Sequence, residues 1–400
     1  MPITQTVSTA DRTSLAFIEQ TAFNTIPPGN PTIAGLRYAS HSLAQQQEVI
    51  TSPEIRGDRQ TLPGKRVSKS TAGDIQAPLS FESHEAFQLA AIGSAAFSSA
   101  QSANTVSGTT VAASGLISGT GIANNVAVGD MVDINGFANT GNNGLYKVLS
   151  LPSGVNALEV DPHPSGADEA GVASVTCQPL QKASNGTSMR VFTIEEQELD
   201  LSGVFTQYVD QYVNGYSMVA DVGALVEQTF SMLGSEMIPD SGATIGDGSN
   251  TPSNDNDVMG PVDEVMAIIQ GVRGSALRID VRRVEVRTEA GGRTRQNLGE
   301  LAPSSIGHGT QKISGVMAML KEDAVQLGRY TNFTDNLSMV YALKDSDGNI
   351  FAYDIPYIQY GDAQVPVSGQ DTDRIIEIPF TGAIQSDEGV MFNFHKFAAP

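Results

Sequence analysis

The chain has 400 residues, enough for two or three domains, and 40% of them are hydrophobic, so it can bury substantial cores. Its net charge of −21 predicts a soluble, self-repelling protein whose general field does not hold nucleic acid. The single cysteine, Cys177, excludes an internal disulfide and a cysteine-cluster metal site, so we expect synthesis in a reducing cytoplasm. No apolar run approaches the ~20 residues of a membrane span, and the N-terminal residues predict no signal peptide.

Short alternating segments separated by Gly, Pro, Asn and Ser predict a mainly β fold. The first residues, 1–32, are expected to form an extended N-terminal arm, because Ile26-Pro-Pro-Gly-Asn-Pro31 does not allow regular structure.

A first unit follows this arm. Residues 36–55 are predicted to be extended, residues 56–71 to form a polar, basic loop, and residues 74–81 to form a strand. Ser83-His84-Glu85 then begins a short helix, with Ser as the expected cap and an acid in the first turn.

The connector at residues 95–108 is rich in Ser and Ala, a composition typical of linkers. Beyond it, residues 129–137 and 144–149 alternate apolar and polar side chains, and Asn142-Asn143-Gly144 is a strong turn signal between them. We interpret this region as a small inserted β-barrel of five or six strands, which folds separately. Residues 236–264 are acidic, without Lys or Arg, and are predicted to be a solvated loop or linker.

The order of the first unit recurs later. Residues 277–286 alternate as a strand, with a phase slip at Arg282-Arg283 that indicates a β-bulge. The loop 291–303, a strand at 311–320 and a short helix after Lys321 complete the series. We interpret the recurrence as an internal duplication of a β-rich module; chance similarity between two sheet-forming segments is the alternative.

These observations give two tandem modules, each with a short helix, plus the insert. The predicted boundaries are residues 1–32 for the arm, 33–108 with 180–235 for the first module, 109–179 for the insert, 236–264 for the acidic linker and 265–400 for the second module.

No catalytic constellation is evident, and we expect no enzyme activity, cofactor or metal site. The five histidines lack neighbours at ligand spacing, and the sequence contains no nucleophile-elbow, phosphate-loop or zinc-protease motif. Asp345-Ser-Asp-Gly-Asn349 has only part of a calcium-loop pattern, so a hairpin turn is predicted there.

The basic loops of the two units are the best functional signal, because the rest of the protein is strongly acidic. Such loops suit an acidic face of another copy. Solvated loops are the simpler alternative, and a nucleic-acid role lacks support because the loops have no interleaved aromatic residues. The predicted contact residues are Arg56, Arg59, Lys65, Arg66, Lys69, Arg293 and Arg295.

The second unit resembles the tail tube (major tail) protein family of long-tailed, non-contractile bacteriophages. The resemblance runs through Asn297–Leu301, Gly309–Leu320, Leu337–Asn349 and Ile378–Ala383, and in the first unit through Leu36–Ser40 and Ser52–Arg59. It covers most of the chain with diffuse patterns.

This resemblance implies β-sandwich or barrel modules whose inner strands join in rings, with the long loops reaching the next ring. It implies a virion protein, assembled in the host cytoplasm, whose stacked rings conduct DNA into the host and meet other tail proteins at the tube ends. Two modules per chain imply rings of three chains with pseudo-sixfold symmetry, the alternative being six chains. A binding protein, such as an adhesin or baseplate component, is the alternative function.

Overall fold

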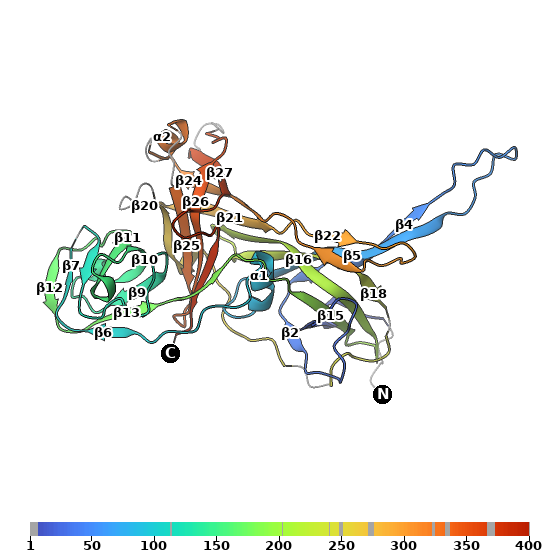
Figure 1. Cartoon of the computed structure of the whole chain (residues 1–400), viewed down its shortest axis with the longest axis horizontal. Coiled ribbons are helices and arrows are strands. Elements are labelled where there is room, and N and C mark those ends of the chain that lie inside the picture. Colours follow the sequence, from blue (N-terminus) through green and yellow to red (C-terminus); the bar gives the residue numbers. More distant parts are fainter. Residues whose placement is uncertain are drawn as a thin grey trace.

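Figure 1 shows a computed structural model of an elongated molecule, with a long hairpin at one end and a separate small lobe at the other. The structure describes residues 7–112, 114–201, 203–239, 241–247, 251–270, 276–321, 325–332, 337–365 and 373–399. Within these ranges the fold is mainly β, as predicted, with two α-helices, α1 (Glu85–Ile92) and α2 (Val325–Thr331). None of the helices described is long and apolar enough to cross a membrane.

Among the described residues, the largest sheet has 18 strands, drawn from both halves of the chain. From the first half come β1 (Thr13–Glu19), β2 (Ala34–Leu36), β3 (Ser40–His41), β4 (Ala44–Ile50), β5 (Lys65–Pro78), β14 (Gln181–Ser184), β15 (Val191–Glu198), β16 (Phe205–Asp221), β17 (Glu227–Gly234) and β18 (Glu236–Ile238). From the second come β19 (Glu264–Gln270), β20 (Ala276–Arg278), β21 (Val281–Glu289), β24 (Lys312–Leu320), β25 (Leu337–Lys344), β26 (Ile350–Tyr360), β27 (Ile375–Gly382) and β28 (Asn393–Phe397).

The two halves pair their strands in the same antiparallel order. In the first half the order is β4-β5-β17-β16-β15-β1-β2. In the second half it is β21-β24-β27-β26-β25-β19-β20. The short strand after each series also matches, because β18 pairs with β16 as β28 pairs with β26. This repeated order is what an internal duplication predicts.

Two junctions join the halves into a continuous sheet: β14 pairs with β28, and the longer pairing is between β16 and β21. Strand β16 is longer than its neighbour β15, and its last residues, Gly215 to Asp221, pair instead with β21. Helix α1 packs against β16 and β21. Its Phe87 ring is buried and stacks on Phe192 at 4.7 Å between centroids. The helix therefore covers the seam between the two halves.

The region predicted as an N-terminal arm contributes a strand to this sheet. Residues 13–19 form β1, between β2 and β15. Leu15 is buried and Phe17 packs on the core, so alternate side chains of this short segment face inward. The acidic segment after β18 also bonds to the first half, where Asn254 and Asn256 donate to the Phe81 carbonyl at 3.0 and 2.9 Å.

The small lobe is a second sheet with a core of its own. It begins at Asn104, before the predicted boundary at Thr109, and it has eight strands, not five or six. The sequence missed the extra strands because several span only three or four residues, too few for alternation to show. They are β6 (Asn104–Val106), β7 (Thr109–Val111), β8 (Leu116–Ser118), β9 (Met131–Asn135), β10 (Gly144–Ser150), β11 (Ala157–Asp161), β12 (Glu169–Val172) and β13 (Val175–Pro179).

His84, and not Ser83, is the N-cap of α1, and its side chain does not cap the helix. Its Nε2 donates to the Arg37 carbonyl at 2.7 Å, and its Nδ1 accepts from Gln228 Nε2 at 2.8 Å. The side chain of Ser83 instead bonds Asn254 at 2.5 Å. Burial lowers the pKa of His84 to about 4, so the imidazole is neutral in the folded protein at pH 7.

We predict that His84 makes the fold acid-sensitive. Because its folded pKa lies below the unfolded value of 6.5, its contribution is complete above pH 6.5 and is lost as the pH falls toward 4. The loss is about 3 kcal/mol across that window. Chemical denaturation at pH 7 and pH 5 should show a smaller pH dependence for His84→Gln than for the wild type. Equal pH dependence would contradict the assignment.

Candidate assembly surface

A long hairpin formed by β4 and β5 projects from the body of the protein (Figure 1). We call its loop, residues 51–64, the arm; it is distinct from the predicted N-terminal arm at residues 1–32. All of its residues except Leu62 are exposed, and the Ile55 side chain is fully so. The side chains of this loop, the isoleucine included, are not buried by the rest of the chain. They are therefore available to contact another molecule.

The second basic loop lies at the base of the first. Strands β22 (Arg293–Arg295) and β23 (Ser305–Gly307) pair as a hairpin of their own. The backbone N–H of Lys69 in β5 donates to the Leu301 carbonyl at 2.8 Å, and Gln296 Nε2 donates to the Val67 carbonyl at 3.1 Å. The two loops that the sequence matched are therefore brought together on one side of the molecule (Figure 1).

The predicted contact residues divide into two groups. Arg56 pairs with Asp58 at 2.8 Å, and Lys69 pairs with Glu236. In the described part of the chain, no ion pair involves the others, which are Arg59, Lys65, Arg66, Arg293 and Arg295.

The position of Arg295 depends on a glycine. Its guanidinium lies across Gly307 of the facing strand, where a Cβ atom would come 2.6 Å from Nη2. All three residues of β22 are exposed, so Arg293 and Arg295 present their charge to solvent. These five exposed cations take part in no ion pair of the described residues, and we refer to them together as the basic surface.

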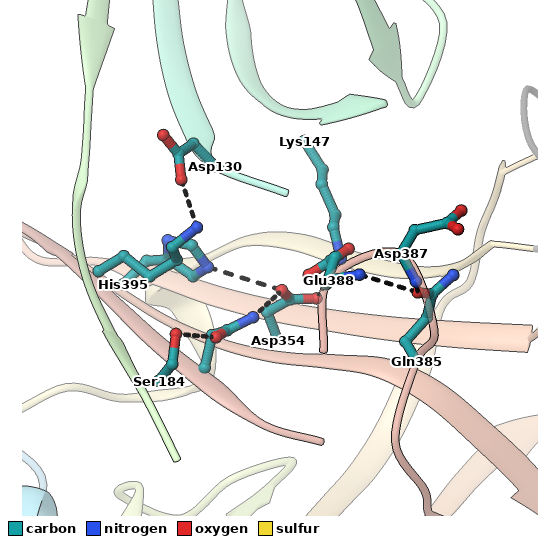
Figure 2. A network of polar contacts seen from close by, with 10 residues as sticks. Asp130, Lys147, Ser184, Asp354, Gln385, Asp387, Glu388 and His395 are labelled. Atoms are coloured by element: carbon teal, nitrogen blue, oxygen red, sulfur yellow. Dashed lines mark hydrogen bonds and ion pairs between the residues drawn. The ribbon is translucent and has the colours of Figure 1, made fainter. Parts of the chain in front are cut away.

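A buried polar network joins the inserted lobe to the second half (Figure 2). Lys147 of β10 lies 2.8 Å from Asp354 Oδ1 of β26 and 3.1 Å from Glu388 Oε1. Asn393 Nδ2 donates to Asp354 Oδ2 at 2.9 Å, and His395 Nε2 is 3.6 Å from the same oxygen. Lys147 and Asp354 are almost completely buried.

The charges of this network stabilise one another. Burial opposes ionisation of Asp354, but the attraction of Lys147 and the interaction with His395 outweigh it and lower the pKa of the carboxyl. Burial likewise acts to lower the pKa of Lys147, but Asp354 and Glu388 raise it. The pair is therefore ionised, and removing one partner would leave an uncompensated charge in the interior.

The sequence contained a signal for this contact that alternation alone could not resolve. Lys147 interrupts the apolar run of Gly144–Ser150, and Asp354 interrupts that of β26. Apolar side chains surround the ion pair, since Met131 and Leu145 of the insert cluster with Val340 and other residues of the second half. Excising the insert would expose this apolar face as well as Asp354.

Other candidates from the sequence have structural roles. The Asp345 carboxylate accepts from the backbone N–H groups of Asp347 and Asn349 at 3.0 and 2.8 Å, which makes the predicted hairpin turn between β25 and β26. His308 Nδ1 bonds Tyr212 Oη at 2.9 Å. Among the residues described, no group of His, Cys, Asp and Glu could hold a metal ion.

In a comparison with known families, the family model described as phage tail tube protein matches residues 10–382. This range includes the insert, both basic loops and the described strands of both halves up to β27. No curated protein matches the sequence.

We predict that Lys147→Met lowers the free energy of unfolding by about 3 kcal/mol, because it leaves Asp354 buried without its cation. Adding Asp354→Asn should recover much of this loss, because the neutral pair carries no unsolvated charge. Urea denaturation of both single variants and the double variant gives the coupling energy. Additive effects of the two substitutions would show that the network does not hold the insert in place.

Proposed function

Because this chain belongs to the phage tail tube protein family, we propose that it self-assembles into stacked rings that form the tube of a long-tailed, non-contractile phage. The tube would conduct DNA from the capsid into the host during genome ejection. The observation that carries the proposal is the extent of the family match, residues 10–382. The family is structural, so the chain is a virion component and not an enzyme.

The charge of the protein supports a conduit that does not retain its cargo. Duplex DNA carries one negative charge per ~1.7 Å of its axis, and each basic group on a wall would add a phosphate contact. A net charge of −21 instead repels the duplex. We therefore propose that DNA passes through the lumen without specific binding.

The arm and the basic surface support contact between successive rings. The β4–β5 hairpin and the β22–β23 hairpin lie on one side of the molecule, and the arm extends well beyond the rest of the fold (Figure 1). Arg59, Lys65 and Arg66 belong to the hairpin, whereas Arg293 and Arg295 lie on the adjacent loop. We propose that this surface meets an acidic face of a copy in the next ring.

The repeated strand order supports three chains per ring. Each half provides the same set of strands, so two halves of three chains would surround the axis with pseudo-sixfold symmetry. The β16–β21 junction already places the halves side by side in one sheet. Assembly occurs in the host cytoplasm in this proposal, and other tail proteins bind at the tube ends.

We predict that reversing the charge of the basic surface blocks stacking without unfolding the chain. Glu at positions 59, 65 and 66, or at 293 and 295, would place like charge against an acidic partner. Electron microscopy should show separate rings for these variants and tubes for the wild type. The double variant Arg56→Glu with Asp58→Arg is a matched control, since it preserves a local ion pair at these two positions. Normal tubes from both reversed proteins would refute the stacking role.

We predict that a reconstruction of the assembled tube shows three copies of the chain per ring, with its two halves at the same height. Six copies per ring, with the two halves in different layers, would refute the three-chain arrangement. Discrete particles that bind glycans, in place of tubes, would favour the alternative of an adhesin or baseplate protein.

A further inference from the structure

We propose that β4 of one chain pairs antiparallel with the segment Gly361–Val365 of a second chain, and so repeats between chains the β16–β21 junction. This inference rests on the proposed assembly into rings and names the edges that meet. It follows from the repeated strand order, because one of two equivalent junctions is made within the chain and the other has no partner strand among the residues that the structure describes.

The β16–β21 junction is the template. On one edge, β16 pairs first with β15 and then, from Gly215 to Asp221, with β21. On its other edge it pairs with β17, with a one-residue irregularity between Val213 and Gly215. Strand β21 is thereby bonded on both edges, to β16 and to β24.

Among the described residues of the second half, the equivalent position is unfilled. On one edge, β26 pairs with β25 only as far as Ile358. Beyond it, the Gly361 and Gln364 N–H groups donate to β27 carbonyls at 2.7 and 2.9 Å, so the chain continues as a strand on that side. The pairing shifts by one residue between Tyr360 and Gln364, as it does in β16. No strand within the described ranges pairs with the opposite edge of Gly361–Val365.

The equivalent of β21 in the first half is β4, and it too has an open edge. Within the part of the chain that the structure describes, β4 pairs with β5 alone. Six of its seven residues are exposed. An open edge with unpaired backbone groups is a site for strand addition.

The helices give independent support. Helix α1 covers the β16–β21 seam and is buried from Phe87 to Ile92. Its counterpart α2 lies beside the open segment, with Tyr330 Oη 3.4 Å from Asp362 Oδ1. Yet Leu327 and Tyr330 are only half-buried and Val325 is exposed. A strand added next to Gly361–Val365 would create a seam for α2 to cover, equivalent to the β16–β21 seam that α1 covers.

A single chain cannot make this contact without closing its sheet on itself. Six strands, β5, β17, β16, β21, β24 and β27, lie between β4 and the open segment. The β4 edge of each chain therefore pairs with the Gly361–Val365 edge of a neighbouring chain. A head-to-tail contact of this kind generates rings when its rotation closes.

The backbone geometry selects a sharp test. Gln364 both donates to and accepts from Glu377, so the N–H groups of Ala363 and Val365 point toward the open edge. Ala363→Pro removes an outward donor that no hydrogen bond of the described residues uses. We expect a folded protein with unchanged thermal stability and at least a tenfold loss of rings. Ala363→Val, which keeps the N–H, is the matched control and should assemble normally. Normal rings from Ala363→Pro would overturn the proposal.

Cysteine cross-linking separates this proposal from the proposed function. Gln364→Cys would be combined with Ala44→Cys, Gln46→Cys or Glu48→Cys, all on exposed positions. The native Cys177 is buried, so it should not interfere. Mild oxidation of assembled protein should give interchain disulfides in one register, and Gln364→Cys with Ser153→Cys on the insert should give none. Tubes without a cross-link in any register would refute these edges and leave the tube function intact. An absence of tubes in the wild type would instead refute the function.

Discussion

The pairing of β16 with β21 is the constraint on which the arrangement of the molecule depends. Backbone N–H and C=O groups of a buried sheet must find partners, and the extra length of β16 beyond β15 leaves a row of them that β15 does not pair. Strand β21 fills that row, and α1 covers the seam with a buried face. The relative placement of the two halves is therefore set by hydrogen bonds between strands and not by a flexible connection. The same need for backbone partners makes the unpaired edges of β4 and Gly361–Val365 candidates for pairing with a second chain.

A second, electrostatic constraint places the insert. Its eight strands have their own core, but Lys147 reaches out of that core to the buried Asp354 of β26. Each charge is favourable only in the presence of the other, so the contact specifies one docking geometry and penalises others. The insert is thus both a separate sheet and a fixed part of the second half's surface.

Much of the fold could be predicted from the sequence, because its signals were local. Alternation predicted a mainly β chain, and the repeated order of strand, basic loop, strand and helix corresponds to β4, the arm, β5 and α1 and to β21, its loop, β24 and α2. The predicted number of strands in the insert was wrong, since strands of three residues are shorter than the run of about four to eight residues over which alternation is recognised. The pairing of Lys69 with Glu236, and the contact of the two basic loops, depend on which strands become neighbours, and no local pattern encodes that. The buried pair of Lys147 and Asp354 was missed for the same reason.

In the part of the chain that the structure describes, the insert belongs to the first half alone, and it lies at the end of the molecule opposite the arm (Figure 1). In a three-chain ring the two faces of the wall would then have different periodicities. A duplex in the lumen would meet a nearly sixfold lining, whereas a molecule approaching from outside would find each insert only once per third of a turn. In that proposed ring, the repeated halves and the insert would together uncouple the symmetry that the genome meets from the symmetry displayed on the exterior.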